Sequence, residues 1–104
     1  MTERVLTDSI VKAIKRAHPD AWVFKVHGHP GQMVGVPDLL VCHRGRLVGL
    51  EVKLPQPGES AAHAVGRATP IQLAQLLAIR RAGGLAAVVL SVADSLFVLD
   101  SIEG

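Results

Sequence analysis

A nearly unbroken apolar run over residues 85–92 (LAAVVLSV) constrains the fold more than any other part of this chain. A strand made almost only of apolar side chains must be covered on both faces, as happens in sheets with helices on either side. Only Trp22, Phe24 and Phe97 are aromatic, so aliphatic side chains must supply most of the core. A chain of 104 residues, 49% of them hydrophobic, is therefore expected to form a single domain over 1–104.

The rest of the chain divides into helices and strands by its hydrophobic periodicity. Apolar side chains recur at helical spacing over 3–17, which predicts a helix, and alternate with polar ones over 22–27, which predicts a strand. Two more strands are expected at 38–43 and 47–53, and a helix opened by a capping-box motif at 69–82. The order α-β-β-β-α-β indicates an α/β fold with a mixed sheet flanked by helices.

Two segments are less regular. Residues 54–68 contain two prolines and two glycines and are expected to form one long loop, which in a small domain is either functional or disordered. The tail from Asp94 fits a short last helix, but residues 96–99 also fit a strand. The apolar side chains of this tail either close the core or form an interface with a second copy of the chain; they are Leu96, Phe97, Val98, Leu99 and Ile102.

Composition excludes several classes of protein. No apolar stretch approaches the roughly 18 residues that a membrane span needs, so no membrane partner is expected. The single Cys42 leaves no disulfide framework and no cysteine zinc site, which favours a cytoplasmic protein. A net charge of +2 permits a nucleic-acid partner without demanding one. The spacing of His27, His29 and His43 does not favour a zinc site.

The most informative residues chemically are Asp38, Glu51 and Lys53. A tight hairpin turn centred on 44–45, Arg-Gly, would place Asp38 directly opposite Glu51, with Cβ atoms about 5 Å apart. Lys53 follows Glu51 by two positions and so points to the same face of the strand. The alternative is an ordinary ion pair between Glu51 and Lys53 on a solvated strand edge.

Two opposed carboxylates destabilise a sheet unless something neutralises them. A shared proton or a divalent cation would do so. A small set of oxygen ligands that leaves positions for water and phosphate suits Mg²⁺ or Mn²⁺ better than zinc. The sequence therefore predicts a magnesium or manganese site at one end of a hairpin.

Three motifs carry a resemblance to a known family: 35–41 (GVPDLLV), 51–53 (EVK) and 69–72 (TPIQ). Together they closely resemble the VRR-NUC family, a branch of the PD-(D/E)XK nucleases of the restriction-endonuclease-like superfamily. The resemblance spans essentially the whole chain, and it implies the αβββαβ core of that superfamily. Two departures affect substrate contacts: no arginine occurs at 32–34, shortly before the first motif, and the 54–68 segment is longer than the usual link.

The resemblance also implies roles for individual residues. Asp38 and Glu51 would bind the metal, with the backbone carbonyl of Val52 as a further ligand, and Lys53 would orient or activate the attacking water. The first-helix acid of the family falls on Glu3, although Glu3 could simply be a favourable charge at a helix N-terminus. The family's helix glutamine falls on Gln72, although Gln72 could act only in the capping box.

Four basic residues are candidate DNA contacts. Lys25 lies on a polar strand face, where a phosphate contact and an ordinary surface lysine are equal alternatives. Arg44, Arg46 and Arg67 fall in a turn and a loop, where they would either steer DNA or have no specific role.

The resulting hypothesis is a metal-dependent endonuclease that cuts branched DNA, in particular Holliday junctions, as the small stand-alone VRR-NUC proteins are thought to do. A homodimer is expected because two symmetric cuts need two active sites. One alternative is a non-catalytic DNA-binding module with a nuclease fold, and another is a flap or nicking endonuclease without junction preference.

Overall fold

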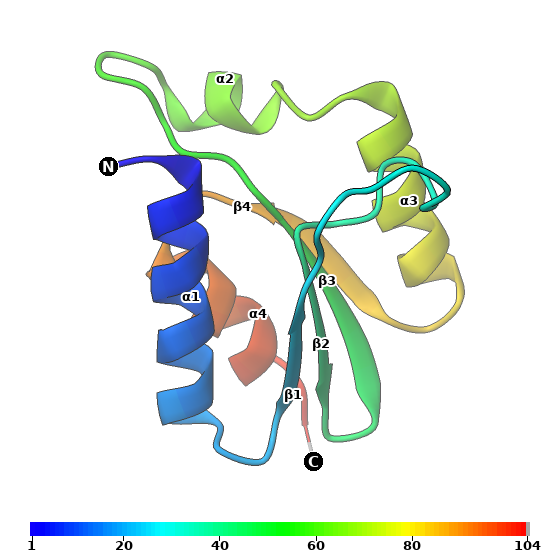
Figure 1. Cartoon of the computed structure of the whole chain (residues 1–104). Coiled ribbons are helices and arrows are strands. Elements are labelled where there is room, and N and C mark those ends of the chain that lie inside the picture. Colours follow the sequence, from blue (N-terminus) through cyan, green and yellow to red (C-terminus); the bar gives the residue numbers. More distant parts are fainter. Residues whose placement is uncertain (104) are drawn as a thin grey trace.

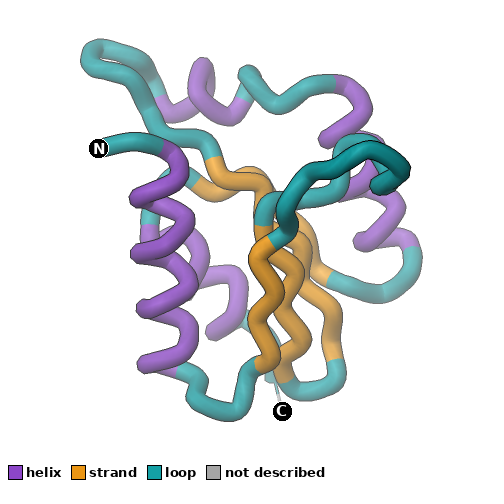
Figure 2. Tube along the Cα trace, in the orientation of Figure 1, coloured by secondary structure: helices purple, strands orange, loops and turns teal. Residues whose placement is uncertain are grey.

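The computed structural model describes residues 1–103. Helices and strands follow one another as shown in Figures 1 and 2. In chain order they are α1 (Glu3–Ala17), β1 (Trp22–Lys25), β2 (Leu39–His43), β3 (Arg46–Val52), α2 (Ala61–Val65), α3 (Pro70–Arg81), β4 (Leu85–Val89) and α4 (Val92–Asp100).

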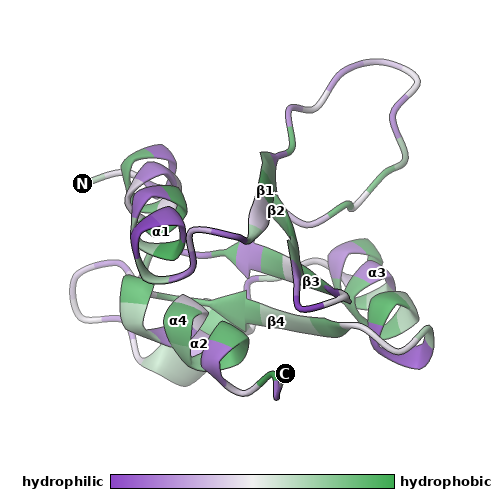
Figure 3. Ribbon diagram, turned by 90° about the horizontal axis from the view of Figure 1, so that it is seen from below, coloured by the Kyte–Doolittle hydropathy of each residue, from purple (hydrophilic) through white to green (hydrophobic). Residues whose placement is uncertain are grey.

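The strands form one mixed sheet in the order β1-β2-β3-β4, with β1, β2 and β3 antiparallel and β4 parallel to β3. Helices α1 and α4 pack together on one face of the sheet, and α3 packs on the other face against β3 and β4 (Figures 1 and 3). This three-layer arrangement confirms the predicted α/β fold with a mixed sheet flanked by helices. None of the helices within residues 1–103 has the length and apolar character that crossing a membrane requires.

The main core lies between the sheet and the α1–α4 layer. Alternate residues of β2 and β3 point into it, while the residues between them face α3 or solvent. Its buried side chains are Leu6, Ile10 and Ile14 of α1, Leu39 and Val41 of β2, Val48, Leu50 and Val52 of β3, Val89 of β4, and Leu99 and Ile102 of the tail.

The hairpin between β2 and β3 has the predicted turn. Arg44 and Gly45 both have positive φ, 51° and 77°, as a two-residue turn of type I′ requires. The strands pair Val41 with Val48 and, at the far end, Leu39 with Leu50. The predicted register is therefore confirmed, and the next position along each strand brings Asp38 to Glu51.

Three sequence-based boundaries change. The 54–68 segment is not wholly irregular, because Ser60 caps the short helix α2 by accepting from the His63 N–H at 3.1 Å. Strand β4 ends at Val89 and not at residue 92, because Ser91 caps α4 and accepts from the Asp94 N–H at 3.0 Å. The tail is thus a helix, and the strand alternative is wrong.

Most of the apolar tail closes the core. Leu99 is fully buried and Ile102 is 5% exposed, whereas Phe97 remains 77% exposed on the outer side of α4. The interface that the tail was expected to offer is therefore reduced largely to Phe97.

Candidate active site

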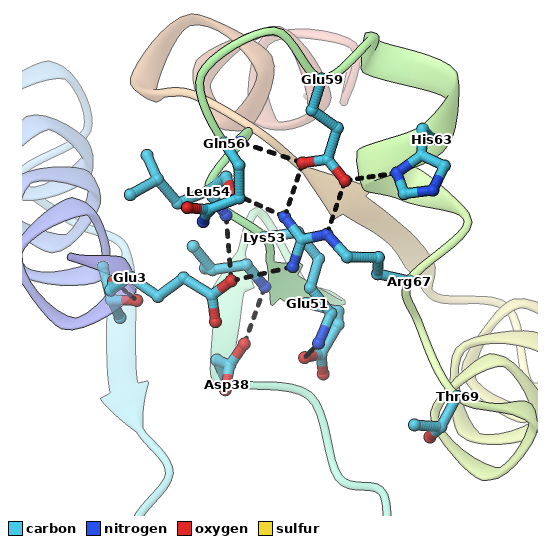
Figure 4. A network of polar contacts seen from close by, with 12 residues as sticks. Glu3, Asp38, Glu51, Lys53, Leu54, Gln56, Glu59, His63, Arg67 and Thr69 are labelled. Atoms are coloured by element: carbon cyan, nitrogen blue, oxygen red, sulfur yellow. Dashed lines mark hydrogen bonds and ion pairs between the residues drawn. The ribbon is translucent and has the colours of Figure 1, made fainter. Parts of the chain in front are cut away.

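The two predicted carboxylates lie at the end of the β2–β3 hairpin, just beyond the last pair of Leu39 with Leu50. Asp38 is held in the sheet from both sides: its carbonyl accepts from the Val26 N–H at 2.9 Å, and its Oδ2 accepts from the Val52 N–H at 2.7 Å. The Asp38 side chain is thereby fixed across the hairpin and points toward β3 (Figure 4).

The loop that delivers Asp38 packs against the start of α3. Gly35 has a φ of 80°, and a Cβ at this position would lie 2.9 Å from the carbonyl oxygen of Ile71. Gln75 Nε2 donates to the Val34 carbonyl at 3.1 Å and holds the same loop from the side. The glycine before Val36-Pro37-Asp38 is thus required by close backbone packing as well as by its dihedral angle.

Glu51 is almost completely buried, with 2% of its surface exposed. Burial, followed by the negative charge of Asp38 and a hydrogen bond with its carboxylate, raises the pKa of Glu51 to about 8, although Lys53 opposes this shift. The Glu51 carboxyl is therefore mostly protonated at neutral pH. The repulsion expected between opposed carboxylates is present in the fold and is relieved by protonation.

Lys53 lies on the same face as Glu51, as their spacing predicts. Its Nζ is 3.5 Å from Glu51 Oε2, and its side chain is only 14% exposed. The ion pair is therefore not the solvated strand edge that served as the alternative. A mostly buried ammonium beside two carboxylates can bind an anionic phosphate or orient a water molecule.

Gln72 completes the capping box and also contacts the candidate site. Its Oε1 accepts from the Thr69 N–H at 2.9 Å, and its own N–H donates to Thr69 Oγ1 at 3.3 Å, which completes the capping box. Its Nε2 donates to Glu51 Oε2 at 3.2 Å. The N-terminus of α3 is thereby tied directly to the buried carboxyl.

Glu3 lies near the site without joining the other two carboxylates. Its Oε2 accepts from the Leu54 N–H at 3.1 Å and is 3.5 Å from Arg67 Nη1. Besides its place in the first turn of α1, Glu3 thus fixes the chain directly after Lys53. Glu3 and Asp38 both line a cavity of about 320 Å³ between α1 and the end of β1.

Arg67 is the centre of a polar network that residue type alone did not predict (Figure 4). Its Nε donates to Glu59 Oε2 at 2.9 Å, and its Nη2 donates to the Leu54 carbonyl at 2.6 Å. Hydrogen bonds from Arg67, the Gln56 N–H and His63 lower the pKa of Glu59 to about 2. Glu59 was not among the predicted site residues, although its position four residues before His63 indicated that the two side chains could pair.

The other basic candidates lie in different places. Lys25 borders the cavity beside Asp38, but its Nζ is paired with Asp8 Oδ1 at 2.7 Å. Arg44 and Arg46 lie at the turn, the opposite end of the hairpin from Asp38, and Arg46 Nε donates to the Gly83 carbonyl at 3.0 Å. The structure therefore brings Lys25 and Arg67 to the rim of the site and separates both turn arginines from it.

The chemistry of the donor set fits a hard divalent cation. No group of three or more His, Cys, Asp or Glu side chains suited to a metal occurs within residues 1–103. A buried carboxyl whose pKa is raised by burial and then by an adjacent carboxylate nevertheless favours a cation between the two groups. Mg²⁺ commonly takes one or two carboxylates and keeps several water ligands, so two acidic side chains are a sufficient protein contribution.

This combination of a three-layer α/β fold and an acidic hairpin end defines a restriction-endonuclease-like architecture. The sequence matches no protein-family profile and no curated protein. Among solved structures, one described as a VRR_NUC domain is 24% identical, with a TM-score of 0.61 over 92% of this chain and 96% of its own. Another, described as a VRR_NUC domain protein, is 22% identical, with a TM-score of 0.65 over 96% of this chain and 86% of its own. The chain has the fold of these VRR_NUC domains, which confirms the fold that its motifs predicted.

Proposed function

We propose that the protein is a VRR-NUC nuclease that hydrolyses DNA phosphodiester bonds with a divalent metal, as PD-(D/E)XK enzymes do. The observation that carries this proposal is the geometry of the hairpin end, where Asp38 lies one position past the pair of Leu39 with Leu50, opposite the buried Glu51, and Lys53 Nζ is 3.5 Å from Glu51 Oε2. A protein that needs no metal has little reason to keep two carboxylates in such a position. The likeness of fold to the VRR_NUC domains supports the same conclusion.

In this proposal Asp38, Glu51 and the backbone carbonyl of Val52 hold Mg²⁺ or Mn²⁺. Such an ion, when bound, polarises the phosphate and lowers the pKa of a water ligand. Lys53 orients the attacking water and stabilises negative charge on the phosphate. Gln72 keeps the Glu51 carboxylate in position through its Nε2, and the Val52 N–H does the same for Asp38.

The test is a cleavage assay on labelled oligonucleotides in Mg²⁺, in Mn²⁺ and in EDTA. We expect cleavage with either metal, none in EDTA, and none for Asp38→Asn purified in parallel. The Lys53→Ala variant should lose turnover more than DNA affinity. DNA binding without cleavage in any metal would instead support the non-catalytic binding module.

We further propose branched DNA, including Holliday junctions, as the substrate, and a homodimer as the active form. One set of Asp38, Glu51 and Lys53 cuts one strand, so two symmetric cuts need two copies related by a two-fold axis. Comparing duplex, flap, splayed and four-way DNA tests the first point, and sedimentation with and without a junction tests the second. A monomer in both conditions would favour a flap or nicking enzyme.

A further inference from the structure

The outer half of the sheet carries an aromatic pair that no helix covers. Helix α3 packs mainly on β3 and β4, which leaves much of this face of β1 and β2 open. Trp22 and Phe24 of β1 are 57% and 47% exposed. Their ring centroids are 5.8 Å apart and their planes differ by only 9°, so the two rings are stacked nearly parallel and form one exposed aromatic patch.

This aromatic pair shares a sheet face with the candidate active site. Phe24 pairs with Leu40 and Trp22 with Cys42. Glu51 of the candidate site lies on the face of the sheet that α3 covers, because its Oε2 accepts from Gln72 Nε2 of α3, and Asp38 lies at the same end of the sheet, directly before β2 begins at Leu39. The order along β2 is therefore the acidic site, then the position of Phe24, then that of Trp22.

A cationic side chain lies at the far end of this path along β2, which leads from the acidic site past Phe24 and Trp22. Arg44 follows Cys42 by two residues at the exposed turn of the hairpin. About six residues of extended chain separate Asp38 from Arg44, which corresponds to about 20 Å. The path from the candidate active site to Arg44 thus has a cationic side chain near each end, Lys53 and Arg44, and an exposed aromatic pair between them.

We propose that Trp22 and Phe24 are a stacking platform for unpaired nucleobases of the DNA strand whose phosphate is bound at Asp38 and Glu51. This inference rests on the proposed nuclease function and specifies its substrate. Aromatic side chains beside a cationic track bind single strands in this way, because every base offers a flat π-face. Bases inside a duplex are stacked on each other and cannot reach a side chain on a sheet, so the substrate needs unpaired nucleotides beside the cut.

Trp22 provides a direct readout, since the chain has one tryptophan and no tyrosine. The Asp38→Asn protein in Mg²⁺ buffer, which keeps the DNA uncut, is titrated with oligo-dT and with an abasic oligonucleotide of equal length. We expect oligo-dT to quench the Trp22 emission and the abasic strand, which keeps the phosphates, to leave it nearly unchanged. Equal quenching by both strands, or none by oligo-dT that anisotropy shows to be bound, would overturn the platform.

Variants separate the platform from other exposed aromatics. Phe24→Ala and Trp22→Ala should each weaken binding of a labelled single strand by about 5- to 100-fold, while Trp22→Phe should restore most of the affinity. Phe97→Ala is the matched control, because Phe97 is 77% exposed on α4, across the sheet. Unchanged affinity for Phe24→Ala and Trp22→Ala would refute the assignment.

Two further results separate this inference from a dimer interface at the same surface and from failure of the proposed nuclease function. A blue shift of Trp22 emission with protein concentration alone would show that a second copy of the chain covers the aromatic pair, and it would reject the platform. Wild-type cleavage is measured in parallel. Metal-dependent cleavage without base-dependent quenching refutes only the platform, whereas quenching without cleavage refutes the nuclease and keeps Trp22 and Phe24 as a binding surface.

Discussion

The side-chain amide of Gln72 connects a helix cap to a buried carboxyl: its Nε2 donates to Glu51 Oε2 at 3.2 Å while its Oε1 accepts from the Thr69 N–H at 2.9 Å. The same side chain therefore fixes where α3 begins and where Glu51 points. A single substitution can remove one of these functions and leave the other, which allows them to be measured separately.

Gln72→Glu should keep the helix cap and impair the active site. A glutamate still accepts from the Thr69 N–H, but it cannot donate an amide N–H to Glu51 and adds a third acidic side chain beside Asp38 and Glu51. We expect the melting temperature to change little and turnover to fall by about 10- to 100-fold, as for other residues that orient metal ligands.

Thr69→Ala is the matched control for that variant. It removes the hydroxyl that caps α3 and should cost about 0.5–2 kcal/mol of stability while leaving the amide of Gln72 free to bind Glu51. Thermal unfolding and steady-state cleavage, measured on both proteins, check the contrast. Loss of activity in Thr69→Ala as large as in Gln72→Glu would contradict a separate positioning role.

Asp38→Asn and Glu51→Gln should abolish cleavage and stabilise the protein in EDTA. Each removes one member of an opposed pair of acidic side chains, whose unfavourable burial together makes Glu51 hold a proton at neutral pH and is expected to cost up to about 1 kcal/mol. That free energy corresponds to a rise in melting temperature of about 4–8 °C for a domain of this size. Differential scanning fluorimetry in EDTA measures the shift; a lower melting temperature for both variants would show that the carboxylates support the fold.

The stability of the protein in EDTA should fall as the pH rises from about 4.5 to about 8. Glu51 has a folded-state pKa of about 8 against an ordinary value of 4.5, so in this range the folded protein holds a proton that the unfolded chain has released. The stability that this proton contributes to the folded protein is fully present below pH 4.5 and is lost as the pH passes 8. Melting curves across this window should show the decline in the wild type and a smaller one in Glu51→Gln.

Arg67→Ala should loosen the 54–68 segment and should not alter the salt dependence of DNA binding. The guanidinium is engaged by Glu59, Glu3 and the Leu54 carbonyl, so it is not free for a phosphate. We expect a small loss of unfolding free energy and faster amide exchange in this segment. A smaller salt slope for DNA binding would instead identify Arg67 as a phosphate contact.

The sequence by itself determined the hairpin and what it aligns. The Arg44-Gly45 pair forms a two-residue turn, which fixes the register of the two strands. With this register, Asp38, Glu51 and Lys53 come together at one end of the hairpin. The capping box of Thr69 and Gln72 was predictable for the same reason, since it depends on four consecutive residues. Such features follow from dihedral preferences and hydrogen bonds over short separations along the chain.

The tertiary structure alone decided which distant groups meet these residues. Glu3 reaches Leu54 across 51 positions and Gln72 reaches Glu51 across 21, distances over which no local preference acts. The shift in the pKa of Glu51 likewise depends chiefly on burial, which packing of α3 and the sheet creates. The same packing covers β3 and β4 but leaves Trp22 and Phe24 exposed, because a helix about 10 Å wide that lies beside β3 and β4 covers about two strands spaced about 4.8 Å apart.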